Sequence, residues 1–102
     1  MDKLFNDFEK WINSKFITWK EQGVIVDKAG EATHAHQFHV EVHSEQGFGH
    51  IALYESNQIY WIDFEAATLN GGDYFQVDIP YENSLSIEKI SRDFIDFMRR
   101  SP

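Results

Sequence analysis

Apolar residues recur every three or four positions near the start of the chain, which is the spacing of one face of an α-helix. The positions on this face are Phe5, Phe8, Ile12, Phe16 and Trp19. Asp2 precedes the pattern as a candidate N-cap, and Gly23 follows it as a candidate C-cap. The pattern therefore predicts a helix from Asp2 to about Gln22. The alternative is a break near Ser14, because residues 16–19 also suit an extended backbone.

In the middle of the chain the hydrophobic period changes to two, as in strands that bury one face. Strands are predicted over residues 33–44, 48–55, 58–66 and 74–79. The connecting turns are predicted at residues 45–47, 56–57 and 70–73. Such short connections make neighbouring strands antiparallel. Residues 24–26 are a β-branched run that suits an additional edge strand, and residues 27–31 are predicted to form a turn around Gly30.

A second amphipathic pattern ends the chain. Its apolar positions are Ile87, Ile90, Phe94, Phe97 and Met98. Ser86 is a suitable N-cap for this helix, and Arg99 and Arg100 suit the negative end of its dipole. Both helices need an apolar surface that buries their stripes, and one face of the strands supplies it. The order of elements predicts an α+β two-layer sandwich, in which an antiparallel meander of four to five strands carries the N-terminal and C-terminal helices on one face.

The length and composition fit one domain over residues 1–102. The chain has no Cys, which excludes a disulfide framework, a thiolate zinc site and a Cys nucleophile. No apolar run approaches the roughly 18 residues that cross a bilayer. The first residues lack the basic and then apolar pattern of a signal peptide. We therefore expect a cytoplasmic protein.

The charge is unevenly distributed. The formal net charge is −8, yet residues 29–88 contain ten Asp or Glu and no Lys or Arg. Such a surface repels nucleic acid, whose binding requires basic residues that neutralise phosphates, and it repels anionic membranes. It attracts a cationic protein and accelerates its association. The alternative is that the acidic charge only keeps the protein soluble.

If both helices cover one face of the sheet, the other face meets solvent or a partner. The residues expected there are His39, Glu41, His43, His50, Tyr54, Ile59, Trp61, Asp63, Glu65, Tyr74, Gln76 and Asp78. Trp and Tyr are enriched among the residues that dominate binding energy at protein interfaces, which favours a binding surface. The alternative is that residues 66–73 or the N-terminal strand cover Trp61 and Tyr74.

All the histidines lie in one short segment of the sequence, where imidazole and carboxylate groups together suggest a metal site. They are His34, His36, His39, His43 and His50. His39 and His43 would lie roughly 13 Å apart along a strand, too far to share one ion. His34 and His36 could share an ion if His50 or a carboxylate joined them. The alternative, which we favour, is ordinary polar strand residues that bind no metal.

Signatures of catalysis are absent from the sequence. There is no GxSxG motif, no Gly-rich phosphate loop and no HExxH motif. Asp63 and Glu65 are two residues apart, a spacing that strand geometry produces without any acid–base chemistry. No enzymatic activity and no cofactor are therefore expected.

Three stretches of the chain, residues 58–65, 70–75 and 94–100, carry a resemblance to a known group. Together with the acidic, Cys-free and aromatic-rich composition, they resemble bacterial immunity proteins paired with contact-dependent growth inhibition toxins. The resemblance is one of overall character and transfers no site residue. It implies a protein that binds and neutralises a cognate toxin. More narrowly, it implies the group whose toxins are tRNA nucleases that work with elongation factor Tu. Elongation factor Tu would then join this chain and the toxin as the third partner of a ternary complex.

This resemblance implies a mechanism that agrees with the charge. A nuclease holds RNA phosphates in a basic cleft, and an inhibitor occupies that cleft by presenting carboxylates. It can equally bind beside the cleft. The candidate toxin-binding residues are Trp61, Asp63, Glu65, Tyr74 and Asp78, with Asp73 and Glu82 at the rim. A monomer is expected. The alternatives are an acidic secretion chaperone, which is typically dimeric, and a metal-binding protein built on the histidines.

Overall fold

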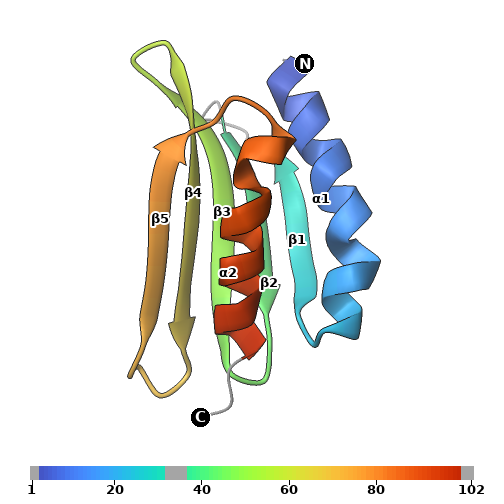
Figure 1. The fold of residues 1–102 in the computed structure, drawn as a ribbon, viewed down its shortest axis with the longest axis vertical. Coiled ribbons are helices and arrows are strands. Elements are labelled where there is room, and N and C mark those ends of the chain that lie inside the picture. The colour runs from blue at the N-terminus through green and yellow to red at the C-terminus, as the bar shows by residue number, and fades with distance from the viewer. Residues whose placement is uncertain (1–2, 32–36, 100–102) are drawn as a thin grey trace.

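The computed structural model describes residues 3–31 and 37–99. Along the chain in these ranges, one α-helix precedes a run of five strands and a second α-helix follows it (Figure 1). The elements in chain order are α1 (Lys3–Glu21), β1 (Ile25–Glu31), β2 (Gln37–His43), β3 (Gly47–Ser56), β4 (Ile59–Thr68), β5 (Tyr74–Pro80), a short 3₁₀ helix η1 (Ser84–Ile87) and α2 (Glu88–Arg99). In this part of the chain neither helix is long and apolar enough to cross a membrane.

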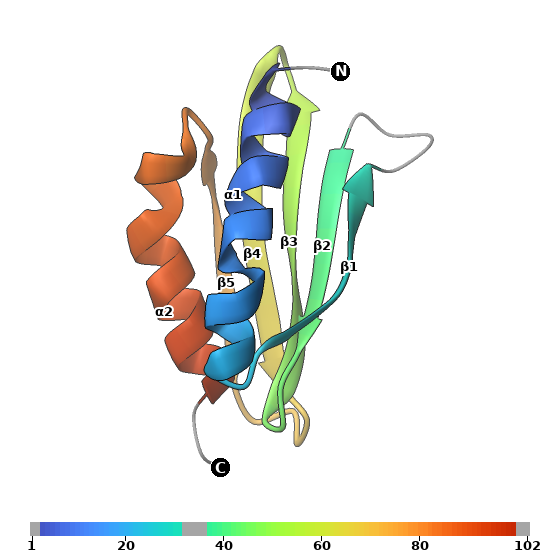
Figure 2. The ribbon, with the colours of Figure 1, turned by 90° about the vertical axis from the view of Figure 1, so that its right-hand side faces the viewer.

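The five strands form one antiparallel sheet in the order β1-β2-β3-β4-β5. Both helices pack on the same face of this sheet, as Figure 2 shows from the side. The predicted α+β sandwich with a meander and two helices on one face is therefore confirmed. The layout leaves the second face of the sheet without a covering helix, and this uncovered side is called the open face below.

The alternation of apolar and polar residues places the core between the sheet and the helices. The strands contribute fully buried side chains at Phe38, Val40, Ile51, Leu53, Ile62 and Phe64. The helices meet them with buried rings, and Phe8 of α1 packs edge-on against Phe38 while Phe94 of α2 packs edge-on against Phe64. Each fully buried side chain of this size stabilises the fold by about 1.5–3 kcal/mol. The predicted inward faces of these strands are confirmed.

The segment 27–31 belongs to a strand, so the turn predicted there is wrong. It continues β1, in which Val26 pairs with Val42 and Lys28 pairs with Glu41. Asp27 lies between them without a counterpart on β2, which makes it the extra residue of a β-bulge. Polar residues and glycine mark both bulges and turns, and the pairing that distinguishes the two is not visible in the sequence.

The tight turn between β3 and β4 lies one residue later than predicted. Ser56 already pairs with Ile59, and the two residues between them have positive φ angles of 54° at Asn57 and 67° at Gln58. Two successive positive φ angles are the geometry of a type I′ turn, whose twist matches the twist of the strands. Asn is favoured at the first of these positions because it tolerates this conformation.

The first helix is continuous, so the alternative break near Ser14 is wrong. The Ser14 hydroxyl donates to the carbonyl of Trp11 at 2.6 Å and is satisfied within the helix. Phe16 was expected in the buried stripe but is 37% exposed, whereas Trp11, expected to widen this stripe, is buried. The rings of Trp11 and Trp19 meet edge-on with centroids 6.0 Å apart, and both belong to the buried face.

The C-terminal helical segment begins earlier than predicted. The side chain of Asn83, and not that of Ser86, caps it by accepting hydrogen bonds from the backbone of Leu85 and Ser86. The first turn has 3₁₀ geometry and leads directly into α2. The proposed cap Asp2 and the terminal Arg100 lie outside the described residues.

A polar contact joins the middle of α1 to the first residue of α2. Glu88 of α2 accepts hydrogen bonds from the Trp11 indole nitrogen at 2.7 Å and from the Lys15 ammonium at 3.1 Å. Burial favours the neutral acid, but the hydrogen bonds from Trp11 and Lys15 and the charges of Lys15 and Arg92 outweigh it and lower the pKa of Glu88 below its ordinary value of 4.5. The ionised carboxylate therefore stabilises the fold.

We expect Glu88→Gln to lower the free energy of unfolding by about 1 kcal/mol at pH 7, because it removes the charge paired with Lys15. A lowered pKa contributes stability above the unfolded value and loses it as the pH falls through the folded value. The difference between wild type and variant should therefore shrink below pH 4.5 in urea unfolding. Glu55→Gln, at an exposed position of β3, is the control. An equal effect of both substitutions would contradict this assignment.

Candidate functional site on the open face

The antiparallel register arranges the open face as rows that run across the strands. Two neighbouring rows carry most of its charge. The first row is His39, Ala52, Asp63 and Asp78, and the second is Glu41, His50, Glu65 and Gln76. Aromatic rows flank them on either side. These are Gln37, Tyr54, Trp61 and Pro80 at one end, and His43, Phe48, Ala67 and Tyr74 at the other.

The structure places the central candidate residues together on this face. Trp61, Asp63, Glu65, Tyr74 and Asp78 come from β4 and β5 and all project away from the helices. Tyr74 is 66% exposed and Trp61 is partly exposed, so the alternative in which both rings are covered is wrong.

The two residues proposed for the rim lie at opposite ends of β5. Asp73 immediately precedes this strand, whereas Glu82 follows it by two residues, and both side chains are exposed. The strand between them spans about 20 Å at the usual rise per residue. Asp73 and Glu82 therefore mark two ends of the face and do not share one contact point.

Asp63 is the most enclosed carboxylate of the open face, with 15% of its side chain exposed. It lies directly opposite Asp78 on β5 and two residues from Glu65 on its own strand. Burial raises the pKa of Asp63, and the neighbouring charges of Glu65 and Asp78 raise it further, although a hydrogen bond from Gln76 at 3.2 Å opposes them. The strands β2 to β5 carry no Lys or Arg that could neutralise this charge.

His50 is the basic side chain that lies next to the carboxylates of Asp63 and Glu65. Its Nε2 atom is 3.5 Å from Asp63 and 3.4 Å from Glu65. One ligand atom from each of the three residues lies within 4.8 Å of the others, an arrangement that could hold a divalent metal ion. Sequence reasoning did not find this group, because it depends on the register in which His50 faces Glu65.

The other histidines divide between two places. His39 lies beside His50, with ring centroids 6.4 Å apart. His43 instead contacts both carboxylate oxygens of Asp27 at 2.7 and 2.8 Å, and Asp27 is the bulge residue of β1. His39 and His43 have different partners, and the group of possible metal ligands in the described residues includes neither of them. His34 and His36 lie outside the described residues.

Tyr54 holds the carboxylate of Asp78 in place. Its hydroxyl donates to the two oxygens of Asp78 at 2.8 and 3.1 Å, reaching from β3 across β4 to β5. Burial and the Asp78 carboxylate raise the pKa of Tyr54 to about 12. The hydroxyl donates to Asp78 from its protonated form and holds the position of this carboxylate.

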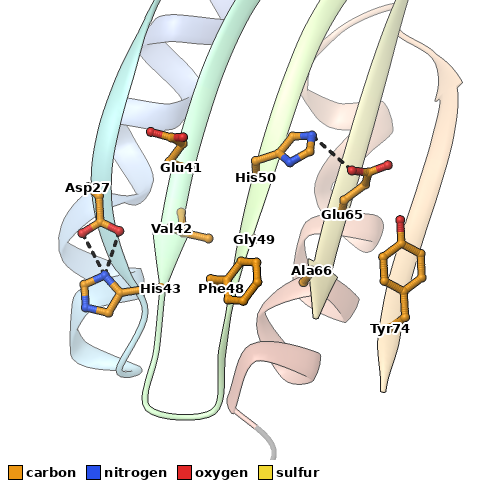
Figure 3. A pocket seen from close by; sticks show the side chains of 10 residues that line it. All are labelled: Asp27, Glu41, Val42, His43, Phe48, Gly49, His50, Glu65, Ala66 and Tyr74. Atoms are coloured by element: carbon orange, nitrogen blue, oxygen red, sulfur yellow. Dashed lines mark hydrogen bonds and ion pairs between the residues drawn. The ribbon is translucent and has the colours of Figure 1, made fainter. Parts of the chain in front are cut away.

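A hollow of about 540 Å³ opens on this face near the β2–β3 and β4–β5 turns. Figure 3 shows its side chains, with Asp27 and His43 at one end and Tyr74 at the other. Its walls also include Glu41, Phe48, His50 and Glu65. Its floor is formed by the backbone of Val42, Gly49 and Ala66. The side chains of Val42 and Ala66 are buried on the helix side of the sheet, and a Cβ atom at Gly49 would point there as well.

Phe48 was missing from the residues expected on the open face. It is 57% exposed in the structure, at the second position of β3. It pairs with His43 on β2 and Ala67 on β4, so it belongs to the same row as Tyr74. The signal was present in the alternation of β3, which puts Phe48 on the same side as His50.

The open face presents charge and apolar surface to the same side. His50, Asp63, Glu65 and Asp78 lie on the same sheet as the exposed rings of Phe48 and Tyr74 and on the same side of it. Comparisons of the chain with models of protein families, with characterised proteins and with solved structures find no match.

Proposed function

We propose that this chain is an immunity protein that binds and neutralises a cognate basic toxin through the open face of its sheet. The observation that carries the proposal is Asp63, a largely enclosed carboxylate in a cluster without Lys or Arg, with exposed rings beside it. Uncompensated charge on a rigid surface costs stability, and a cationic partner would relieve that cost. The role requires binding and no turnover.

The toxin in this proposal is a nuclease that acts in the cytoplasm. Its cleft must be basic to hold phosphates, and Asp63, Glu65 and Asp78 offer carboxylates to the same basic groups. Trp61 and Tyr74 supply the aromatic anchors from which interfaces gain most of their binding energy. A tRNA nuclease that works with elongation factor Tu is the narrower form of the same proposal.

The test uses the C-terminal domain of the protein encoded immediately upstream of this chain. The two proteins, purified separately and mixed, should form a one-to-one complex by size-exclusion chromatography with light scattering. The association rate should fall about tenfold when the salt rises from roughly 0.05 to 0.5 M, because opposite charges steer the encounter. Co-expression of this chain should also restore growth of cells that produce the domain.

Absence of a complex, or growth arrest that this chain does not relieve, would contradict the proposal. The free chain should elute as a monomer of 12.0 kDa. A stable dimer that binds an extended segment of an effector would instead support a secretion chaperone.

A further inference from the structure

We infer that the hollow on the open face receives an arginine side chain of the partner, with its guanidinium between Glu41 and Glu65 and its plane against an aromatic ring. This inference rests on the proposed function and specifies the chemistry of one contact. It keeps Glu65 and Tyr74 of the toxin-binding set expected from the sequence and adds Glu41, Phe48 and the hollow itself, which were not part of that set.

The carboxylates are placed to accept a forked donor. Glu41 and Glu65 lie in the same row of the sheet, on either side of His50. Strands are spaced 4.7–4.9 Å apart, so their Cα atoms are about 10 Å apart. Arginine offers five N–H donors in a planar fork, which can reach carboxylates on two sides at once.

The next row supplies the apolar walls. Phe48 and Tyr74 are 57% and 66% exposed, and they stand on β3 and β5 with only the small Ala67 of β4 between them in the row. A methyl group leaves the space between the two rings open. A guanidinium stacks on aromatic faces, and its aliphatic stem can cover the rings from water.

His50 stands between Glu41 and Glu65 in the row, and no Lys or Arg of the described residues pairs with either carboxylate. Lys28 lies opposite Glu41 at the β1 edge, but among the described residues it makes no ion pair. Asp27, at the same end of the hollow, is already held by His43. Glu65 is hydrogen-bonded by the Tyr74 hydroxyl and flanked by His50 at 3.4 Å, so its carboxylate is oriented by neutral and imidazole groups and pairs with no Lys or Arg of the described residues.

Arginine suits the hollow better than lysine. An ammonium is a compact and strongly hydrated point charge, and it cannot bridge two carboxylates while stacking on a ring. The hollow is open to solvent and has ring walls, so a weakly hydrated planar cation loses less on entering it. The preference for arginine is therefore the distinctive consequence of this geometry.

The experiment titrates the ¹⁵N-labelled chain with N-acetyl-arginine amide and, separately, with N-acetyl-lysine amide at constant ionic strength. Saturable shifts are expected at Phe48, Glu65 and Tyr74, with arginine amide binding at least about threefold more tightly than lysine amide. Glu65→Gln should weaken the binding of arginine amide about fivefold. Asp96→Asn, which removes the same charge from an exposed position of α2, should leave it unchanged.

Equal shifts from the two amides, shifts centred away from the hollow, or an equal loss in the Glu65 and Asp96 variants would each overturn the inference. Each variant's amide spectrum shows directly whether it is folded. If the upstream domain forms its complex while arginine amide does not bind at the hollow, the arginine contact is wrong and the proposed function stands. If arginine amide binds but no complex forms, the proposed function fails instead.

Discussion

The double variant Asp63→Asn/Glu65→Gln is expected to bind the upstream toxin domain roughly 100-fold more weakly than wild type. Both substitutions keep the size of the side chain and remove the charge that a basic partner would contact. Loss of a charge at an interface commonly costs a few kcal/mol, and Asp63 is enclosed enough for the effect to be large. Surface plasmon resonance at fixed salt measures the change.

The same variant is expected to be more stable than wild type at pH 7. Asp63 and Asp78 are directly opposed like charges, and such pairs destabilise a sheet by up to about 1 kcal/mol. The pKa of Asp63 is raised in the folded state, first by burial, so the ionised form is the less stable one. The advantage of the variant should therefore shrink as the pH falls and the wild-type carboxyl takes up its proton.

The matched control is Asp93→Asn/Asp96→Asn, which removes the same charge from exposed positions of α2 on the other side of the molecule. This variant should lose little affinity, since exposed charges far from a contact act weakly through screened solvent. Two outcomes would contradict the account. One is an equal loss of affinity in both double variants, and the other is a decrease in stability when Asp63 and Glu65 are neutralised.

Gly49→Ala is expected to lower the free energy of unfolding by about 3 kcal/mol, the upper end of the usual cost of overpacking. A Cβ atom at this position would lie 2.6 Å from the carbonyl oxygen of Glu65 and 3.1 Å from the ring of Phe94. The first neighbour is the backbone of β4 and the second is a core residue of α2. Neither can move without separating two strands or lifting the helix.

Gly30→Ala provides the matched control for this prediction. Gly30 lies in β1, and a Cβ atom there would meet nothing within 4 Å. Replacing a strand glycine where space allows should leave stability unchanged or raise it by about 0.4–1 kcal/mol. Urea unfolding of both variants decides the matter, and equal stability of the two would show that β3 and β4 approach less closely than described.

The sandwich architecture was predictable because each element has a strong local signal. The alternation through Phe38, Val40 and Val42 determines which face of β2 is buried, and the residues 70–73 mark a turn by composition alone. The same alternation also placed Asp63 and Tyr74 on the open face. Burial dominates these choices, so sequence periodicity is enough to predict them.

Features that depend on pairing between strands were not predictable. The bulge at Asp27 requires knowledge of its partner strand, and the group of His50, Asp63 and Glu65 requires the register of β3 against β4. A shift of one residue would move His50 to the opposite face. The hollow next to Phe48 depends on the same register, so sequence alone could list its residues but could not assemble them.

The proposal that the partner binds the open face of the sheet is tested most directly by mapping where the partner binds. Amide and Trp side-chain signals of the ¹⁵N-labelled chain should be followed while the unlabelled upstream toxin domain is added. Perturbed signals are expected from Trp61, Asp63, Glu65 and Tyr74 on β4 and β5, while the exposed side of α1 and α2 should be unaffected. A footprint on the helices, with the signals of the open face unchanged, would contradict the proposal.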